Sequence, residues 1–98
     1  MAKFIMLIRY TDEGVRHFHD FQTRMQHARR GAEELGVTVE SFYLTMGDYD
    51  AVVTVDAPDV RTAAKLSLIN AANGRVRTVT MPAFSEAETA ELAGELPA

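Results

Sequence analysis

The sequence predicts a single α+β domain over residues 1–98, in which two helices cover one face of a four-stranded antiparallel sheet. Four short segments have the apolar patterning of strands, and two longer segments with helical spacing lie between them. The two middle strand segments are joined by only a few residues, which predicts a hairpin.

The first strand is expected at residues 3–10, KFIMLIRY, where both faces are apolar for most of the length, as in a central strand. Thr11 can cap the helix that follows, and apolar residues recur at helical spacing until Gly36. The pattern also permits a break in this helix near Asp20. Residues 37–46 and 49–55 predict the second and third strands.

The second helix is expected to begin near Asp59 and to run to about Asn73, followed by the stop signal Gly74. Its predicted sheet-packing stripe consists of Val60, Ala63, Ala64, Ser67, Leu68 and Ala71. Residues 75–84 predict the fourth strand, and Pro82 indicates an edge position or the strand end. Ser85 and Glu88 predict the capping box of a short final helix, and we expect the tail 93–98 to fray.

The order β-α-β-β-α-β plus a short C-terminal helix is that of a ferredoxin-like sandwich. Right-handed crossovers place both main helices on one face of the sheet and leave the other face bare. The first two strands nevertheless carry apolar residues on both faces, and a bare apolar face is larger than soluble monomers usually tolerate. We therefore expect sheet-on-sheet dimerisation that encloses a cavity.

Composition narrows the classes of function. The formal net charge of −4 disfavours nucleic acid as a partner, because phosphate binding needs a basic surface. No apolar segment approaches the roughly 20 residues of a membrane span, so we expect no membrane partner. The sequence has no cysteine and no recognisable signal peptide, which agrees with a cytoplasmic location.

Several stretches resemble the GYD-domain family, whose members are small proteins of the dimeric α/β-barrel type. The similar stretches are RYTDEG at 9–14, ARRGAEELG at 28–36, FYLTMGDYDAVVTVDAPD at 42–59 and GRVRTVTMPAF at 74–84. The central stretch is the most specific, because it joins a Gly-x-Tyr-Asp turn to a strand and an Ala-Pro-Asp helix start. The resemblance implies the fold and a homo-oligomeric assembly, and it implies little about activity.

Gly47-Asp48-Tyr49-Asp50 holds two carboxylates beside a tyrosine. One interpretation is a hairpin turn in which aspartate accepts hydrogen bonds from nearby backbone amides. The other is a ligand site at the mouth of the intersubunit cavity, with Tyr49 as hydroxyl donor and Asp48 or Asp50 as orienting group or base. Strand alternation places the two carboxylates on one side and Tyr49 on the other.

Arginine side chains on the first and fourth strands are further candidates, because these strands are neighbours in the ferredoxin-like order. Arg9, Arg75 and Arg77 either form structural ion pairs with Asp50 or Glu40, or clamp a carboxylate ligand. Tyr10 and Tyr43 are also candidates for lining the cavity between subunits. The candidate ligand-binding residues are Arg9, Tyr10, Tyr43, Asp48, Tyr49 and Asp50.

The histidines do not have metal-ligand spacing. His17 and His19 diverge by about 200° on a helix, which prevents them from sharing a metal ion. His27 does not lie above either of them along the helix. The sequence contains no glycine-rich nucleotide motif and no P-loop. We expect no metal and no cofactor.

The function expected from these observations is a small-molecule binding or accessory protein that acts as a homo-oligomer. Two alternatives stay open. One is a cofactor-independent monooxygenase or isomerase of the dimeric α/β-barrel type, which rests on analogy of fold. The other is a structural or regulatory oligomer without a ligand. The sequence alone does not decide whether the protein is an enzyme.

Overall fold

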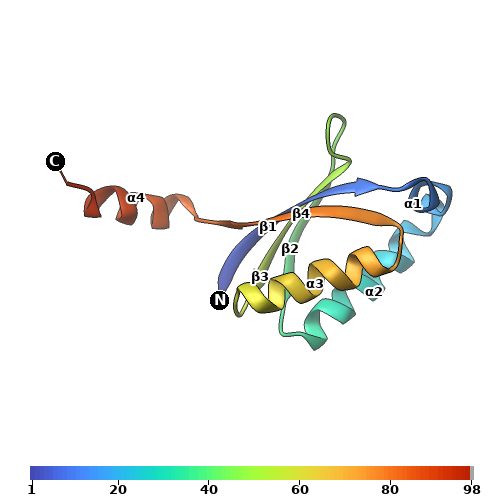
Figure 1. The fold of residues 1–98 in the computed structure, drawn as a ribbon, viewed down its shortest axis with the longest axis horizontal. Helices are drawn as coiled ribbons and strands as arrows, with labels where there is room; N and C mark the ends of the chain where they lie inside the picture. The colour runs from blue at the N-terminus through green and yellow to red at the C-terminus, as the bar shows by residue number, and fades with distance from the viewer. Residues whose placement is uncertain (98) are drawn as a thin grey trace.

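The computed structural model describes residues 1–97 and confirms the ferredoxin-like α+β fold. Four strands form one antiparallel sheet in the order β2-β3-β1-β4. Helices α2 and α3 lie on the same face of this sheet (Figure 1). The elements are β1 (Ala2–Tyr10), α1 (Asp12–Arg16), η1 (Phe18–Asp20), α2 (Phe21–Glu34), β2 (Thr38–Leu44), β3 (Ala51–Ala57), α3 (Val60–Ala72), β4 (Val76–Ala83) and α4 (Glu86–Glu95).

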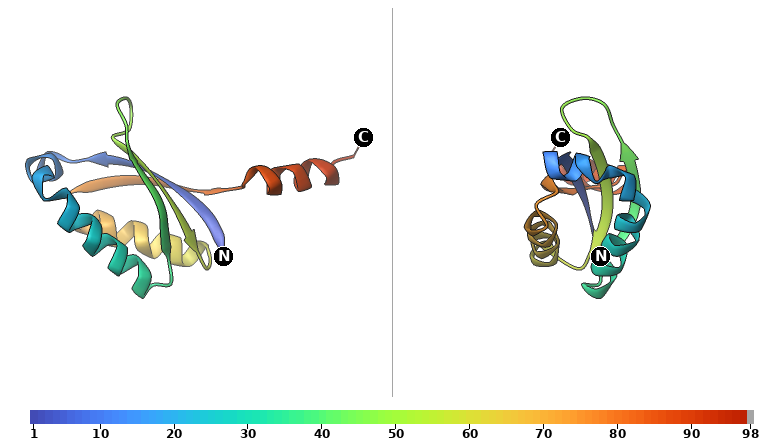
Figure 2. Two further views of the ribbon diagram at one scale, coloured as in Figure 1. Left: turned by 180° about the vertical axis from the view of Figure 1, so that it is seen from behind. Right: turned by 90° about the vertical axis from the view of Figure 1, so that its right-hand side faces the viewer.

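The first helical region breaks into two α-helices with a 3-10 turn, η1, between them. Thr11 caps α1, since its side chain accepts a hydrogen bond from the backbone N–H of Gly14 at 3.1 Å. The break permitted near Asp20 is therefore present. It turns α2 away from the end of β1 and across the sheet (Figure 2).

The core lies between the helices and one face of the sheet. Central strand β1 contributes Phe4 and Met6, and its neighbour β3 contributes Val53 and Val55. Directly paired residues share a face, and these pair as Phe4 with Val55 and Met6 with Val53. The intervening residues Ile5, Leu7 and Arg9 therefore point to the opposite face, which no helix covers in Figure 2.

The packing stripe predicted for α3 is partly wrong. Ala63 and Leu66 are the buried residues of this helix, whereas Val60 and Leu68 are 68% and 71% exposed. The helix is rotated from the predicted position because Leu66, rather than Leu68, fills the core against the sheet. Val60, Ala64 and Leu68 instead form an exposed stripe at i, i+4 spacing, which we call the α3 outer stripe.

Strand β4 is an edge strand, as Pro82 predicted, and this proline pairs with Phe4. The chain then leaves the sheet, and α4 extends away from the rest of the domain (Figure 1). Ser85 and Glu88 form the predicted capping box of α4. This helix includes the first residues of the tail 93–98, and Ala98 lies outside the described residues.

Candidate functional site

The Gly-Asp-Tyr-Asp segment is part of the connection between β2 and β3. Backbone hydrogen bonds hold it, from Thr45 N–H to the carbonyl of Asp50 at 2.8 Å and from Asp50 N–H to the carbonyl of Ile8 at 2.8 Å. The Thr45 hydroxyl donates to the carbonyl of Tyr49 at 2.6 Å. The segment is thus a hairpin connection that is also fastened to central strand β1.

The two aspartates have different structural roles. The Asp50 carboxylate accepts a hydrogen bond from the backbone N–H of Tyr10 at 2.8 Å. Asp48 contributes its backbone carbonyl, which accepts from Nε of Arg9 at 2.8 Å. Asp48 is exposed, while Asp50 is partly buried at the end of β1.

Tyr49 and Arg9 meet on the uncovered side of the sheet. The Arg9 guanidinium carbon lies 4.7 Å from the centre of the Tyr49 ring, which is within the range of a cation–π contact. With Arg77 and Val79 they line a small depression of about 140 Å³. Tyr43 is 67% exposed on β2, where it pairs with Val52.

Tyr10 belongs to the opposite, helix-covered face. Its ring meets the edge of Phe18 with a centroid separation of 5.2 Å and an interplanar angle of 80°. Burial, followed by the negative charge of Asp50, raises the pKa of the Tyr10 hydroxyl. The six candidate ligand residues therefore divide between two faces of one sheet, and their role in binding stays a prediction.

The three strand arginines do not form the expected ion pairs. Within residues 1–97, neither Asp50 nor Glu40 pairs with any of them, and Glu40 pairs with Lys3 instead. Arg9 donates to Asp48, and Arg77 donates to the backbone carbonyls of Ala71 and Val76.

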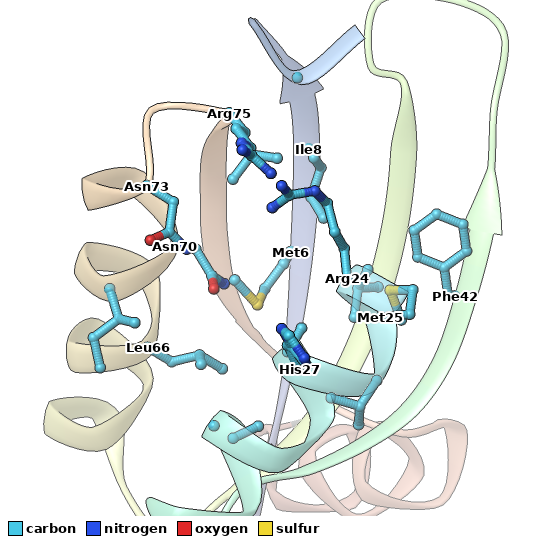
Figure 3. A pocket seen from close by; sticks show the side chains of 18 of the residues that line it. Met6, Ile8, Arg24, Met25, His27, Phe42, Leu66, Asn70, Asn73 and Arg75 are labelled. Carbon is cyan, nitrogen blue, oxygen red and sulfur yellow. The ribbon is translucent and has the colours of Figure 1, made fainter. Parts of the chain in front are cut away.

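Arg75 lies apart from the other two arginines, because it enters a cavity between α2 and α3. This cavity has a volume of about 630 Å³ and opens above the helix-covered face of the sheet (Figure 3). Met6, Ile8, Phe42 and Leu66 supply apolar lining. The polar side chains labelled in the lining are Arg24, His27, Asn70, Asn73 and Arg75.

Sequence reasoning expected a cavity between subunits and did not expect this one within the chain. The only signal was the arginine that directly follows the helix stop at Gly74. Two of the histidines have local partners: His17 lies 3.0 Å from Glu13, and His19 lies 3.5 Å from Asp20. His17 and His27 both lie in the lining of the cavity.

Residues 4–93 match the family described as GYD domain. The chain belongs to the GYD-domain family. The match begins in β1 and ends in α4, so this GYD domain includes the hairpin, the cavity and the uncovered sheet face. Among the helices of residues 1–97, none has both the length and the apolar character needed to cross a membrane.

Two known proteins are similar to this GYD domain over most of its length. The chain is 34% identical over 89 residues to the "Glutamine synthetase and cystathionine beta-lyase binding protein" of Thermus thermophilus, covering 90% of this chain and 94% of that protein. It is also similar to the crystal structure of TTHA0845 from Thermus thermophilus. That similarity has a TM-score of 0.53 and 28% sequence identity, and it covers 87% of this chain and 95% of the other.

Proposed function

We propose that this GYD-domain protein is an accessory protein that assembles with a second copy of itself and binds metabolic enzymes. The observation that carries the proposal is the 34% identity, over nearly the whole chain, to a protein named for binding glutamine synthetase and cystathionine β-lyase. We place this activity in the cytoplasm, since the similar protein is named for binding two metabolic enzymes.

Self-association is assigned to the uncovered face of the sheet. Val79, Met81 and Tyr43 are 45%, 36% and 67% exposed there, beside Ile5 and Leu7 of the central strand. Polar groups lie toward both ends of this face, with Arg9 at one end and the Lys3–Glu40 pair at the other. An apolar centre with a polar rim is the arrangement found in protein interfaces.

Enzyme binding is assigned to the α3 outer stripe. Val60 and Leu68 are large apolar residues on the side of α3 that points away from the sheet, and Ala64 lies between them. Arg61 and Lys65 are exposed beside the stripe. This surface stays accessible when the uncovered sheet face is paired, because the two surfaces lie on opposite sides of the domain (Figure 2).

The test is a binding titration with purified glutamine synthetase and cystathionine β-lyase from the same genome, together with native mass spectrometry. We expect the wild type to be a dimer or larger oligomer and to bind at least one of the enzymes. Leu68→Asp should abolish enzyme binding without changing the subunit count, whereas Val79→Asp should dissociate the oligomer. Both side chains are exposed, so neither change should unfold the domain.

Each part of the proposal has an outcome that contradicts it. A wild type that binds neither enzyme contradicts the accessory function. Unchanged enzyme binding by Leu68→Asp contradicts the use of the α3 outer stripe. A monomeric wild type, or an unchanged oligomer of Val79→Asp, contradicts assembly through the uncovered sheet face.

A further inference from the structure

Within residues 1–97, one guanidinium nitrogen of the partly buried Arg75, Nη1, is buried in the cavity between α2 and α3 without a hydrogen-bond partner. A buried donor on a charged group that stays unpaired is costly, because the group loses its hydration and gains nothing in return. The donor capacity of Arg75 Nη1 is therefore unused until a hydrogen-bond acceptor enters the cavity.

The backbone that carries Arg75 is fixed by its contacts with the start of α1. The N–H of Thr11 donates to the carbonyl of Arg75 at 3.0 Å, and the Thr11 hydroxyl donates to the carbonyl of Gly74 at 2.7 Å. Gly14 packs against the same Arg75 carbonyl, with no room for a Cβ atom. The guanidinium thus projects from a rigid base.

A second cation faces the same space. Arg24 projects from α2 into the cavity, opposite Arg75 (Figure 3). The ion pairs among residues 1–97 include neither Arg24 nor Arg75. Glu34 also lines the cavity, but it is ten residues further along α2, or about 15 Å by helical rise.

We propose that this cavity binds a small amphipathic carboxylate. The carboxylate accepts hydrogen bonds from Arg75, whose planar fork matches the two oxygens, and the charge of Arg24 adds to the attraction. The side-chain amides of Asn70 and Asn73 lie beside this end of the cavity (Figure 3). The apolar body of the ligand packs on Met6, Phe42 and Leu66.

The size and lining of the cavity agree with this ligand class. Small-molecule sites typically have volumes of about 300–1,000 Å³, with mostly apolar walls and a few convergent polar groups. At about 630 Å³ the cavity can hold a ten-carbon chain or a fused bicyclic ring. The site is separate from the surfaces assigned to self-association and enzyme binding, so either proposal can fail without the other.

Isothermal titration calorimetry tests the proposal with two carboxylates, decanoate and 2-naphthylacetate, and with decanol and 2-naphthylethanol as uncharged counterparts. We expect saturable binding of at least one carboxylate, tighter than its alcohol by about tenfold or more. Arg75→Met removes the charge and keeps the aliphatic stem. It should weaken carboxylate binding by about tenfold and leave alcohol binding unchanged.

The matched control is Arg30→Met, at an exposed position of α2 outside the cavity lining, which should bind the carboxylate as the wild type does. Arg75→Met should also melt at the same temperature as the ligand-free wild type or higher, because it removes an unpaired buried donor. Arg24→Met, at an exposed position on the other wall, should weaken carboxylate binding without unfolding the domain.

Three outcomes would overturn the proposal. The first is no saturable binding of either carboxylate. The second is alcohols that bind as tightly as the carboxylates, which would indicate an apolar cavity without charge recognition. The third is carboxylate binding that is unchanged in both arginine variants, which would place the binding elsewhere on the protein.

Discussion

Gly14 contacts the carbonyl group of Arg75 so closely that no larger residue fits between them. A Cβ atom on Gly14 would overlap the Arg75 carbonyl oxygen and lie 3.1 Å from its carbonyl carbon. This contact joins α1 to the start of β4, two segments that are distant in the sequence. It also fixes the base from which Arg75 enters the cavity.

The first prediction concerns this contact. Gly14→Ala should lower the free energy of unfolding by about 1–3 kcal/mol, because the added methyl group overlaps backbone atoms that cannot move independently. The better helix propensity of alanine offsets at most about 1 kcal/mol of this loss. Urea denaturation followed by circular dichroism measures the difference.

Gly31→Ala is the matched control. Gly31 lies inside α2, and a Cβ atom there meets nothing within 4 Å. This change should stabilise the protein by about 0.5–1 kcal/mol, because alanine restricts the unfolded chain and favours the helix. If the two variants had equal stability, the close packing of Gly14 on Arg75 would not matter energetically.

The second prediction separates the two aspartates of the hairpin. Asp50→Ala should cost about 1–3 kcal/mol, since the partly buried N–H of Tyr10 loses its acceptor. Asp48→Ala should change stability by less than about 0.5 kcal/mol, because within residues 1–97 Asp48 accepts the Arg9 hydrogen bond through its backbone carbonyl, which the substitution keeps. Thermal unfolding of the two variants beside the wild type gives the comparison, and equal losses would contradict it.

Features set by neighbouring residues could be predicted from the sequence. The turn at Gly47-Asp48, the edge position of Pro82 and the Ser85–Glu88 capping box all depend on local chemistry, and the structure contains each of them. These features need no knowledge of how the helices dock. The expected strand alternation of Tyr49 and the two aspartates does not apply, because β3 begins at Ala51 and all three residues lie in the connection before it.

Features set by helix docking could not be predicted in the same way. Helix α3 has apolar residues on two sides, so periodicity alone did not reveal that Leu66 is buried and Leu68 exposed. The cavity depends on the separation of α2 from α3, which no local pattern encodes. Arg75 precedes β4, so strand alternation does not place its side chain.

The third prediction concerns the contact between Arg9 and Tyr49. Tyr49→Phe retains an aromatic face under the guanidinium and should leave the melting temperature nearly unchanged. Tyr49→Ala should cost about 0.5–1 kcal/mol, which is the usual size of an exposed cation–π contact. A double-mutant cycle with Arg9→Ala isolates the pairwise part. A coupling energy of zero would show that the contact is not energetically significant.

The fourth prediction is a dependence of stability on pH at the start of α3. Oδ1 of Asp59 accepts hydrogen bonds from the Thr62 backbone N–H at 2.8 Å and from the Thr62 hydroxyl at 2.7 Å. The backbone bond, followed by the hydroxyl bond, lowers the pKa of the Asp59 carboxyl. The folded protein therefore holds this proton less tightly than the unfolded chain does.

The sign of the effect follows from this difference. The stabilisation by Asp59 is fully present above the unfolded pKa of about 3.9 and is lost as the pH falls through the lower folded value. Asp59→Ala should melt at a lower temperature than the wild type at pH 7, and this gap should narrow as the pH falls from about 5 toward 3. Asp59→Ser keeps a cap that does not titrate, so its advantage over Asp59→Ala should stay constant over the same range. A wild-type advantage that is equally constant would mean that the Thr62 bonds do not distinguish the charged carboxylate from the neutral acid.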